Sequence, residues 1–299
     1  MSKLDKINEK YQKLGENPDT YLKGLYHAKP LNYWDYVEVD TLLSLQKPRT
    51  HFKDETVFIM YHQLTELLLK MMRHELEQIV EEETVTADFL ATKISRLNRY
   101  TGMLINSFDI MREGMDYDDY NAFRTTLTPA SGFQSAQFRY LELYCTRLEN
   151  LVHEDGKKRL PPQPPVEALF ENIYWKDAGL DRTTGKKSLT MRQFESRYLE
   201  DLIQLAKKLR GHTLEDIIQQ LPALPATLKD ALREFDHLYN VAWPMVHLRT
   251  AEHYLIKKGK KKAATGGSDW QKYLHPGHQR RIFFPGLWTA AELRQWGTQ

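Results

Sequence analysis

The sequence predicts an all-α protein with a smaller helical insertion after residue 157. Apolar residues recur three and four positions apart over long stretches, as they do on one face of a helix. No alternation of apolar and polar residues is long enough to build a sheet. Glycines and prolines stand where the periodic stretches stop or start, so the breakers agree with the periodicity.

The first expected helices have recognisable ends. The segment 54–83 begins with the acidic pair Asp54 and Glu55, which suits the positive end of a helix dipole. The segments 88–114 and 132–156 have the same apolar spacing and stop at a glycine or just before one.

The later helices are expected at 190–211, 227–242, 244–259 and 289–297. Pro244 is a residue favoured in the first turn of a helix. Thr289 precedes Glu292 by three residues, which is the spacing of a capping box.

The connections between these helices indicate the domain organisation. The Pro-rich stretch 159–170 is expected to be extended, and 175–188 to be a loop. The stretch 257–268 combines a lysine run with glycines, which is typical of a mobile, solvated loop. We expect one domain over 1–299 with a helical insertion at about 157–225.

Composition excludes several classes of protein. The 299 residues are 41% hydrophobic and 27% charged, as in a globular protein with a sizeable core. A net charge of +2 gives no reason to expect nucleic acid or membrane as partner. The single cysteine, Cys145, excludes an internal disulfide and suits a reducing, cytoplasmic compartment. The N-terminus lacks the apolar core of a signal peptide, and no apolar run reaches membrane-helix length.

Common catalytic and metal-binding motifs are absent from the sequence. There is no CxxC, HExxH, EF-hand, GxSxG or phosphate-binding glycine loop. The pairs Glu252–His253 and Asp236–His237 are adjacent in sequence and therefore diverge around a helix, which argues against a non-haem carboxylate metal site. Cys145 lies in a helix-like stretch without an activating neighbour, so a buried core position is expected.

Histidines on apolar helix faces are the remaining candidates. Phe58 lies four residues before His62, and Trp243 four residues before His247, so each pair shares a helix face. His253 is about 240° further round from His247, so at most one of those two is a ligand. Taken singly, such histidines are more often core or surface residues, but an imidazole in this setting is also an axial ligand of haem iron.

Arg124 and the stretch 264–268 each have two interpretations. Arg124 can be a surface residue packed on Phe123 or paired with Asp118 or Asp119, or it can clamp a carboxylate with its planar guanidinium. The stretch 264–268, Ala-Thr-Gly-Gly-Ser, can be a flexible linker, or its backbone and the Thr265 hydroxyl can approach a small ligand closely.

Several blocks resemble the tryptophan 2,3-dioxygenase family in the family's order. They include 33–46, the helix segment 54–70 with Phe-x-x-x-His, and 123–142 with the distinctive "TPASGFQSAQFR". The later blocks are "WPMVHLRTAEHYL", "ATGGSDWQKYL" and "RIFFPGLW". The resemblance implies an all-α, haem-binding helical bundle whose N-terminal segment reaches a neighbouring subunit of a homotetramer, a dimer of dimers.

The resemblance also implies a role for each matching residue. His247 would be the proximal haem ligand, with Trp243 and Ser131 beside the haem. His62 would accept the indole N–H and be the catalytic histidine. The substrate-binding residues would be Phe58, Tyr120 and Leu127 around the ring, Arg124 and Thr265 at the carboxylate, and Tyr33 from a neighbouring subunit.

The implied reaction is the insertion of both atoms of O2 across the C2–C3 bond of L-tryptophan, giving N-formylkynurenine, with haem b as cofactor. One alternative is a haem oxygenase of another indole or aromatic amino acid, suggested by Tyr61, Tyr120, Leu68 and Leu69, which depart from the family's usual residues. Another is a non-enzymatic helical interaction protein that uses the lysine run 257–262, which the near-neutral net charge disfavours.

Overall fold

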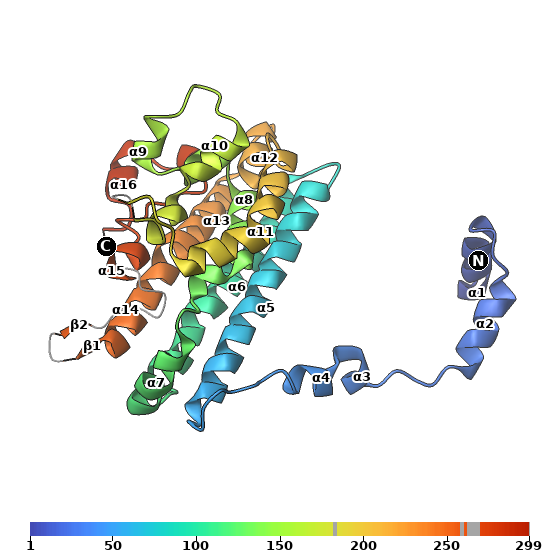
Figure 1. Ribbon diagram of the computed structural model, residues 1–299. Coiled ribbons are helices and arrows are strands. Elements are labelled where there is room, and N and C mark those ends of the chain that lie inside the picture. Colours follow the sequence, from blue (N-terminus) through green and yellow to red (C-terminus); the bar gives the residue numbers. More distant parts are fainter. Residues whose placement is uncertain (182–183, 258–259, 262–269, 299) are drawn as a thin grey trace. The chain divides into compact units, whose positions relative to one another are not determined.

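The computed structural model describes residues 1–181, 184–257, 260–261 and 270–298, and it separates into two compact units, Met1–Lys47 and Pro48–Gln299. Within the described residues the molecule is helical apart from one short strand pair, which confirms the predicted all-α class (Figure 1). None of the described helices has both the length and the apolar character needed to cross a membrane.

The N-terminal unit consists of short helices that bury none of their own side chains. These are α1 (Lys3–Lys13), α2 (Pro18–His27), α3 (Tyr33–Val37) and α4 (Val39–Leu43). The sequence pattern predicted no helix before residue 54, so these four helices are additional to the prediction. Leu25, Tyr33, Trp34 and Tyr36 are among the apolar side chains left exposed, which is unusual for a segment with so many large rings.

The larger unit contains the remaining elements. In chain order they are α5 (Asp54–Glu81), α6 (Ala87–Arg112), α7 (Tyr117–Phe123), η1 (Arg124–Leu127), η2 (Gly132–Gln134), α8 (Ala136–Cys145), η3 (Leu148–Leu151), α9 (Glu154–Lys157), α10 (Val166–Glu171), η4 (Tyr174–Ala178), α11 (Leu189–Lys208), α12 (Leu214–Gln220), α13 (Ala226–His237), the π-helical turn η5 (Leu238–Ala242), α14 (Trp243–Leu255), β1 (Ile256–Lys257), β2 (Lys260–Lys261), α15 (Trp270–Leu274), η6 (Pro285–Leu287) and α16 (Ala290–Arg294).

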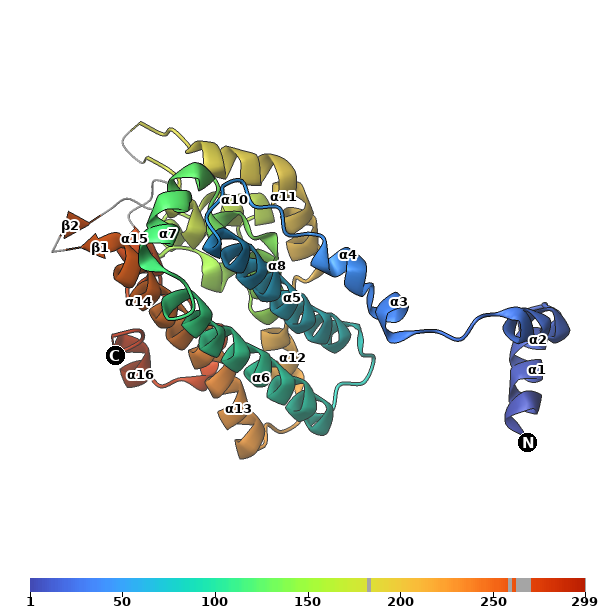
Figure 2. The ribbon, with the colours of Figure 1, turned by 90° about the horizontal axis from the view of Figure 1, so that it is seen from below.

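The long helices α5 and α6 form the centre of this unit. They pack against each other as an antiparallel pair, with α8 beside α5 and with α13 and α14 beside α6 (Figure 2). Their buried faces have the three- and four-residue spacing on which the prediction rested: Leu68, Leu69, Met72, Leu76 and Ile79 on α5, and Leu90, Ile94, Leu97, Leu104 and Phe108 on α6.

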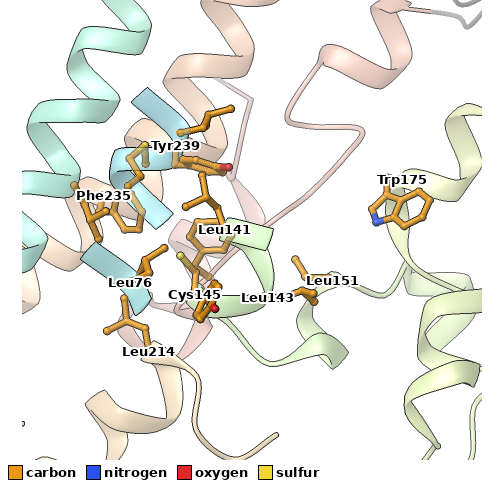
Figure 3. Close-up of a cluster of buried hydrophobic side chains, with 14 of the residues drawn as sticks. Leu76, Leu141, Leu143, Cys145, Leu151, Trp175, Leu214, Phe235 and Tyr239 are labelled. Carbon is orange, nitrogen blue, oxygen red and sulfur yellow. The ribbon is translucent and has the colours of Figure 1, made fainter. Parts of the chain in front are cut away.

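One core cluster connects the helices of the larger unit. It includes side chains from α10, α11 and α12, so the region 157–225 shares the core of the bundle. Cys145 is fully buried in this cluster near Leu76 and Phe235, and burial raises the pKa of its thiol (Figure 3). The expected role of Cys145 as a core residue is therefore confirmed.

Helix 132–156 was predicted as one element, and this was wrong. The chain forms η2, α8, η3 and α9 instead, with a break after Cys145. The carboxylate of Glu215 accepts hydrogen bonds from the Thr146 hydroxyl at 2.9 Å and from the Arg147 N–H at 3.0 Å. This tertiary contact from α12 satisfies polar groups that a continuing helix would have used.

Three other predicted boundaries also change. The helix expected over 244–259 ends at Leu255. The chain then enters the strand pair β1–β2, in which Ile256 pairs with Lys261. The stretch 159–170 is extended only until α10 begins, and 175–188 includes η4. The capping box predicted at Thr289 is confirmed, since Thr289 and Glu292 each accept the other's backbone N–H.

A buried ion pair fixes α5 against α6. The Lys93 ammonium lies 2.7 Å from the Glu75 carboxylate, both side chains are almost completely buried, and Arg96 approaches the same carboxylate at 3.2 Å. Burial raises the pKa of Glu75, but the hydrogen bonds from Lys93 and Arg96 outweigh it and leave the pKa below its usual value. The pair therefore holds Glu75 ionised in the fold.

We predict that Glu75→Gln lowers the free energy of unfolding by about 2–4 kcal/mol, because it leaves a buried ammonium without its counter-charge. The pKa of Glu75 is depressed in the folded state, so the stabilisation is present above the unfolded pKa of about 4.3 and is lost as pH falls through the folded value. Urea unfolding of both proteins between pH 3 and pH 7 measures this difference.

Glu77→Gln is the matched control on the same helix, since Glu77 pairs with Arg73 at 2.7 Å in a more exposed position. We expect it to cost less than about 1 kcal/mol. Equal losses in the two variants, or a loss at Glu75 that does not shrink in acid, would contradict this account of the α5–α6 pair.

Candidate active site

Two histidines from different helices face the same region of the bundle. His62 lies on α5, and its Nδ1 is 2.7 Å from the Phe58 carbonyl oxygen. A carbonyl oxygen only accepts, so Nδ1 carries the hydrogen and Nε2 is the acceptor nitrogen of the neutral ring. Burial lowers the pKa of His62, which keeps the imidazole neutral near pH 7.

His247 lies on α14, and burial, followed by the charge of His62, lowers its pKa to about 4. The two histidines are linked through the Phe108 ring, which lies 5.4 Å from His247 and 5.7 Å from Tyr61, the neighbour of His62. Both residues nevertheless have exposed surface.

Aromatic rings connect the two histidines. The Tyr61 ring lies 5.2 Å from that of His62 and 5.7 Å from that of Phe108, and Phe108 lies 5.4 Å from His247. On the other side of His62, the Phe58 ring approaches at 4.1 Å. Aromatic rings therefore lie beside both histidines, and such rings favour a flat apolar ligand.

Arg124 lies next to these aromatic rings. It is the first residue of η1 and is only 8% exposed, so its interpretation as a solvated surface residue is wrong. Burial raises the pKa of Tyr120, while the charge of Arg124 and its hydrogen bond to the Tyr120 hydroxyl oppose that shift. The Tyr120 ring in turn lies 6.0 Å from Phe58, which links the guanidinium to the surroundings of His62.

The other candidate residues lie as follows. Leu127 ends η1, and Ser131 caps η2, where its hydroxyl accepts the Phe133 N–H at 3.3 Å. Trp243 opens α14 with its ring 5.1 Å from that of Tyr239. Tyr33 is 72% exposed and belongs to the N-terminal unit, and Thr265 lies outside the described residues.

A buried hydrogen-bond network around Asp236, in the turns that precede α14, was not predicted from the sequence. The Asp236 carboxylate is fully buried and accepts hydrogen bonds from Asn240, from the backbone N–H groups of Phe283 and Phe284, and from the Trp288 indole, all between 2.8 and 3.1 Å. Burial raises the pKa of Asp236 to about 6 in spite of these bonds. The sequence signal that could have indicated this network was an acidic residue, Asp236, among the apolar positions of 227–242.

The donor side chains of this region would suit a group held by one imidazole better than a chelated metal ion. Within the described ranges, no group of three or more His, Cys, Asp or Glu side chains is placed to hold a metal ion. A neutral imidazole on a helix, with aromatic rings beside it, is one of the side chains that can hold a haem iron. His253, six residues further along α14, packs edge-on against Tyr117 instead.

Comparison with known proteins agrees with this geometry. Residues 24–159 match a family model described as tryptophan 2,3-dioxygenase. Curated proteins named tryptophan 2,3-dioxygenase are similar over most of the chain. They include those of Polaromonas sp. strain JS666 (28% identity, 87% of each chain), Bacillus anthracis (29%, covering 87% of this chain and 91% of the relative) and Ruegeria sp. strain TM1040 (29%, covering 88% and 92%).

The fold and these relatives define the class as the all-α dioxygenases. Within that class, residues 24–159 match the tryptophan 2,3-dioxygenase family model and relatives of that name are similar over 87–88% of the chain, so the resemblance found in the sequence is confirmed. His62, Tyr120, Arg124 and Ser131 lie inside the matched range, whereas His247 lies beyond it.

Proposed function

We propose that the protein is a haem-dependent dioxygenase that opens the indole ring of L-tryptophan with O2 and gives N-formylkynurenine, the first step of the kynurenine pathway. The observation that carries this proposal is the placement of a buried guanidinium, an aromatic wall and an acceptor imidazole in one region. Arg124, Phe58 and His62 supply these three parts. An aromatic amino acid has the complementary carboxylate, ring and, in tryptophan, a ring N–H.

His247 would hold the haem, since its neutral imidazole has a free electron pair for the iron. When bound, the haem supplies the iron chemistry that activates O2. Trp243 and Ser131 would lie beside the cofactor, as their positions at the start of α14 and at η2 allow. A cytoplasmic location suits the single free thiol of Cys145.

The chain's own residues would bind and orient the substrate. Arg124 would clamp the carboxylate with two parallel N–H donors, and Phe58, Tyr120 and Leu127 would hold the indole. His62 Nε2 would accept the indole N–H, which fixes the orientation of the ring and keeps that proton at the nitrogen. Thr265 would approach the amino-acid end of the substrate. Positioning in a dry pocket is the protein's contribution to the rate.

An oxygenase of another aromatic amino acid is the second candidate. Its support is Tyr61, whose ring is 5.2 Å from His62 and nearly perpendicular to it, a bulky neighbour for any substrate. Formation of N-formylkynurenine from L-tryptophan, O2 and a reductant by the haem-loaded protein tests the first proposal. No product at millimolar L-tryptophan, with turnover of another aromatic amino acid, would select the second.

We predict that His247→Ala abolishes the Soret band of the haem-loaded protein, because the imidazole that would hold the iron is removed. His253→Ala is the matched control on the same helix, and it should retain the band. Circular dichroism of both variants checks that the helices are intact. A Soret band of unchanged position in His247→Ala would show that another residue binds the iron.

Arg124→Lys should raise the KM for L-tryptophan by about tenfold, because a lysine keeps the charge but loses the two-pronged contact with a carboxylate. The control is Arg99→Lys, which changes an exposed arginine of α6 in the same way. Steady-state kinetics measure both variants. If the Arg124 variant keeps the wild-type KM, the carboxylate binds elsewhere.

We also propose a homotetramer, a dimer of dimers, in which Tyr33 reaches the site of a neighbouring copy. Two exposed apolar surfaces support assembly. One is the ring-rich N-terminal unit, and the other is a stripe on α5 formed by Met60, Leu64, Leu67 and Met71. These stripe residues repeat at three- and four-residue spacing, as in helices that pack against a partner.

Co-expression of two inactive variants tests the role of Tyr33. A Tyr33→Ala chain should have low activity, as should a His247→Ala chain, but mixed oligomers should recover part of it. In a mixed oligomer, an intact pocket can receive Tyr33 from the chain that lacks His247. Activity no higher than that of either parent, or full activity of Tyr33→Ala alone, would reject this role.

A further inference from the structure

Residues of the 157–225 region contact the loop that follows Arg124. The Thr190 hydroxyl, near the start of α11, donates a hydrogen bond of 2.9 Å to the Pro129 carbonyl oxygen. Thr190 is 5% exposed, so this bond is shielded from water. A second bond joins the Gln134 amide to the Gln193 side chain at 3.2 Å.

An aromatic contact reinforces these two hydrogen bonds. Phe133, at the centre of η2, lies 5.8 Å from the ring of Trp175 and 5.5 Å from that of Phe194, edge-on in both cases. The Arg139 guanidinium covers the same ring at 5.5 Å. Together, Trp175, Thr190, Gln193 and Phe194 form what we call the brace, because they hold the loop 128–134 from outside.

The braced loop is directly continuous with the carboxylate clamp. Arg124 begins η1, Leu127 ends it, and the Ala130 N–H donates to the Leu127 carbonyl at 2.7 Å. Pro129 lies inside this turn, so a shift of its carbonyl moves the end of η1. The Arg124 guanidinium depends on the direction of η1, since its backbone is the first turn of that element.

A further hydrogen bond joins the 157–225 region to α15. The Tyr273 hydroxyl donates a 2.7 Å hydrogen bond to the Asp177 carbonyl oxygen in η4. The chain around η4 and the first turns of α11 therefore holds both the loop after Arg124 and the helix α15.

We propose that Thr190 is a positioning residue for the carboxylate end of the substrate, and that the brace is the functional contribution of the 157–225 region. Its hydroxyl fixes the Pro129 carbonyl, the loop fixes η1, and η1 aims Arg124. Thr190 does not itself touch the substrate. The effect on the substrate rests on the proposed function, whereas the brace is a property of the fold.

Thr190→Val and Thr190→Ser test this proposal in the haem-loaded full chain. Valine has nearly the shape of threonine without the hydroxyl, and serine keeps the hydroxyl. We expect Thr190→Val to raise the KM for L-tryptophan about fivefold with kcat changed less than twofold, the effect of one lost buried hydrogen bond. Thr190→Ser should stay within twofold of wild type in both constants.

Hydrogen–deuterium exchange of the protein without substrate supplies an independent measurement. Amides of 124–134 should exchange faster in Thr190→Val than in wild type or Thr190→Ser. Thr101→Val is the matched control, because the buried Thr101 hydroxyl also donates to a backbone carbonyl, that of Leu97 within α6. It should change neither the KM nor the exchange of 124–134.

Three results would overturn the proposal. They are an unchanged KM in Thr190→Val, a Thr190→Ser variant as impaired as Thr190→Val, and an equal rise of KM in Thr101→Val. If the wild-type protein formed no N-formylkynurenine, the proposed function would fail, while the exchange measurement would still decide whether Thr190 braces the loop.

Discussion

The antiparallel contact between α5 and α6 is the constraint on which the rest of the larger unit depends. The buried bond between Lys93 and Glu75 sets the register of the two helices, because a slip of either one would strand a charge in the core. In an antiparallel pair, residues that precede Glu75 on α5 meet residues that follow Lys93 on α6. Tyr61 therefore lies against Phe108, and the His62 ring comes to the end of the pair that His247 approaches from α14.

The candidate site combines charge and apolar surface. The Arg124 guanidinium is almost fully buried and makes a hydrogen bond to the Tyr120 hydroxyl. A planar guanidinium matches a carboxylate through two parallel hydrogen bonds, so such a site favours ligands that bring one. The rings around His62 impose the second requirement, a flat apolar group of matching size.

Much of the fold followed from sequence because local signals and tertiary structure agree there. The helix α5 begins at Asp54, as its acidic first turn predicted, and Thr289 caps the last helix as its spacing predicted. The break after Cys145 could not be predicted, since it depends on Glu215, distant in sequence. The network around Asp236 was hidden for the same reason. For the site, spacing identified His62, His247 and Arg124 as candidates. Only the fold shows that the rings of Tyr61 and Phe108 connect the two histidines and that Arg124 is buried.

The π-helical turn Leu238–Ala242 makes chain length a constraint of its own in this region. An α-helix advances about 100° per residue, and the wider π turn accommodates one residue more than an α turn would. Removal of a single residue from this turn would leave an ordinary α turn. Removal of a residue of α14 between Trp243 and His247 would instead rotate the imidazole by about a quarter of a turn relative to Trp243. Side chains between Trp243 and His247 can be exchanged with local cost, but the number of residues cannot change without moving the imidazole. In descent from a common ancestor, insertions and deletions would be expected to accumulate in the connections of the bundle and to spare this stretch.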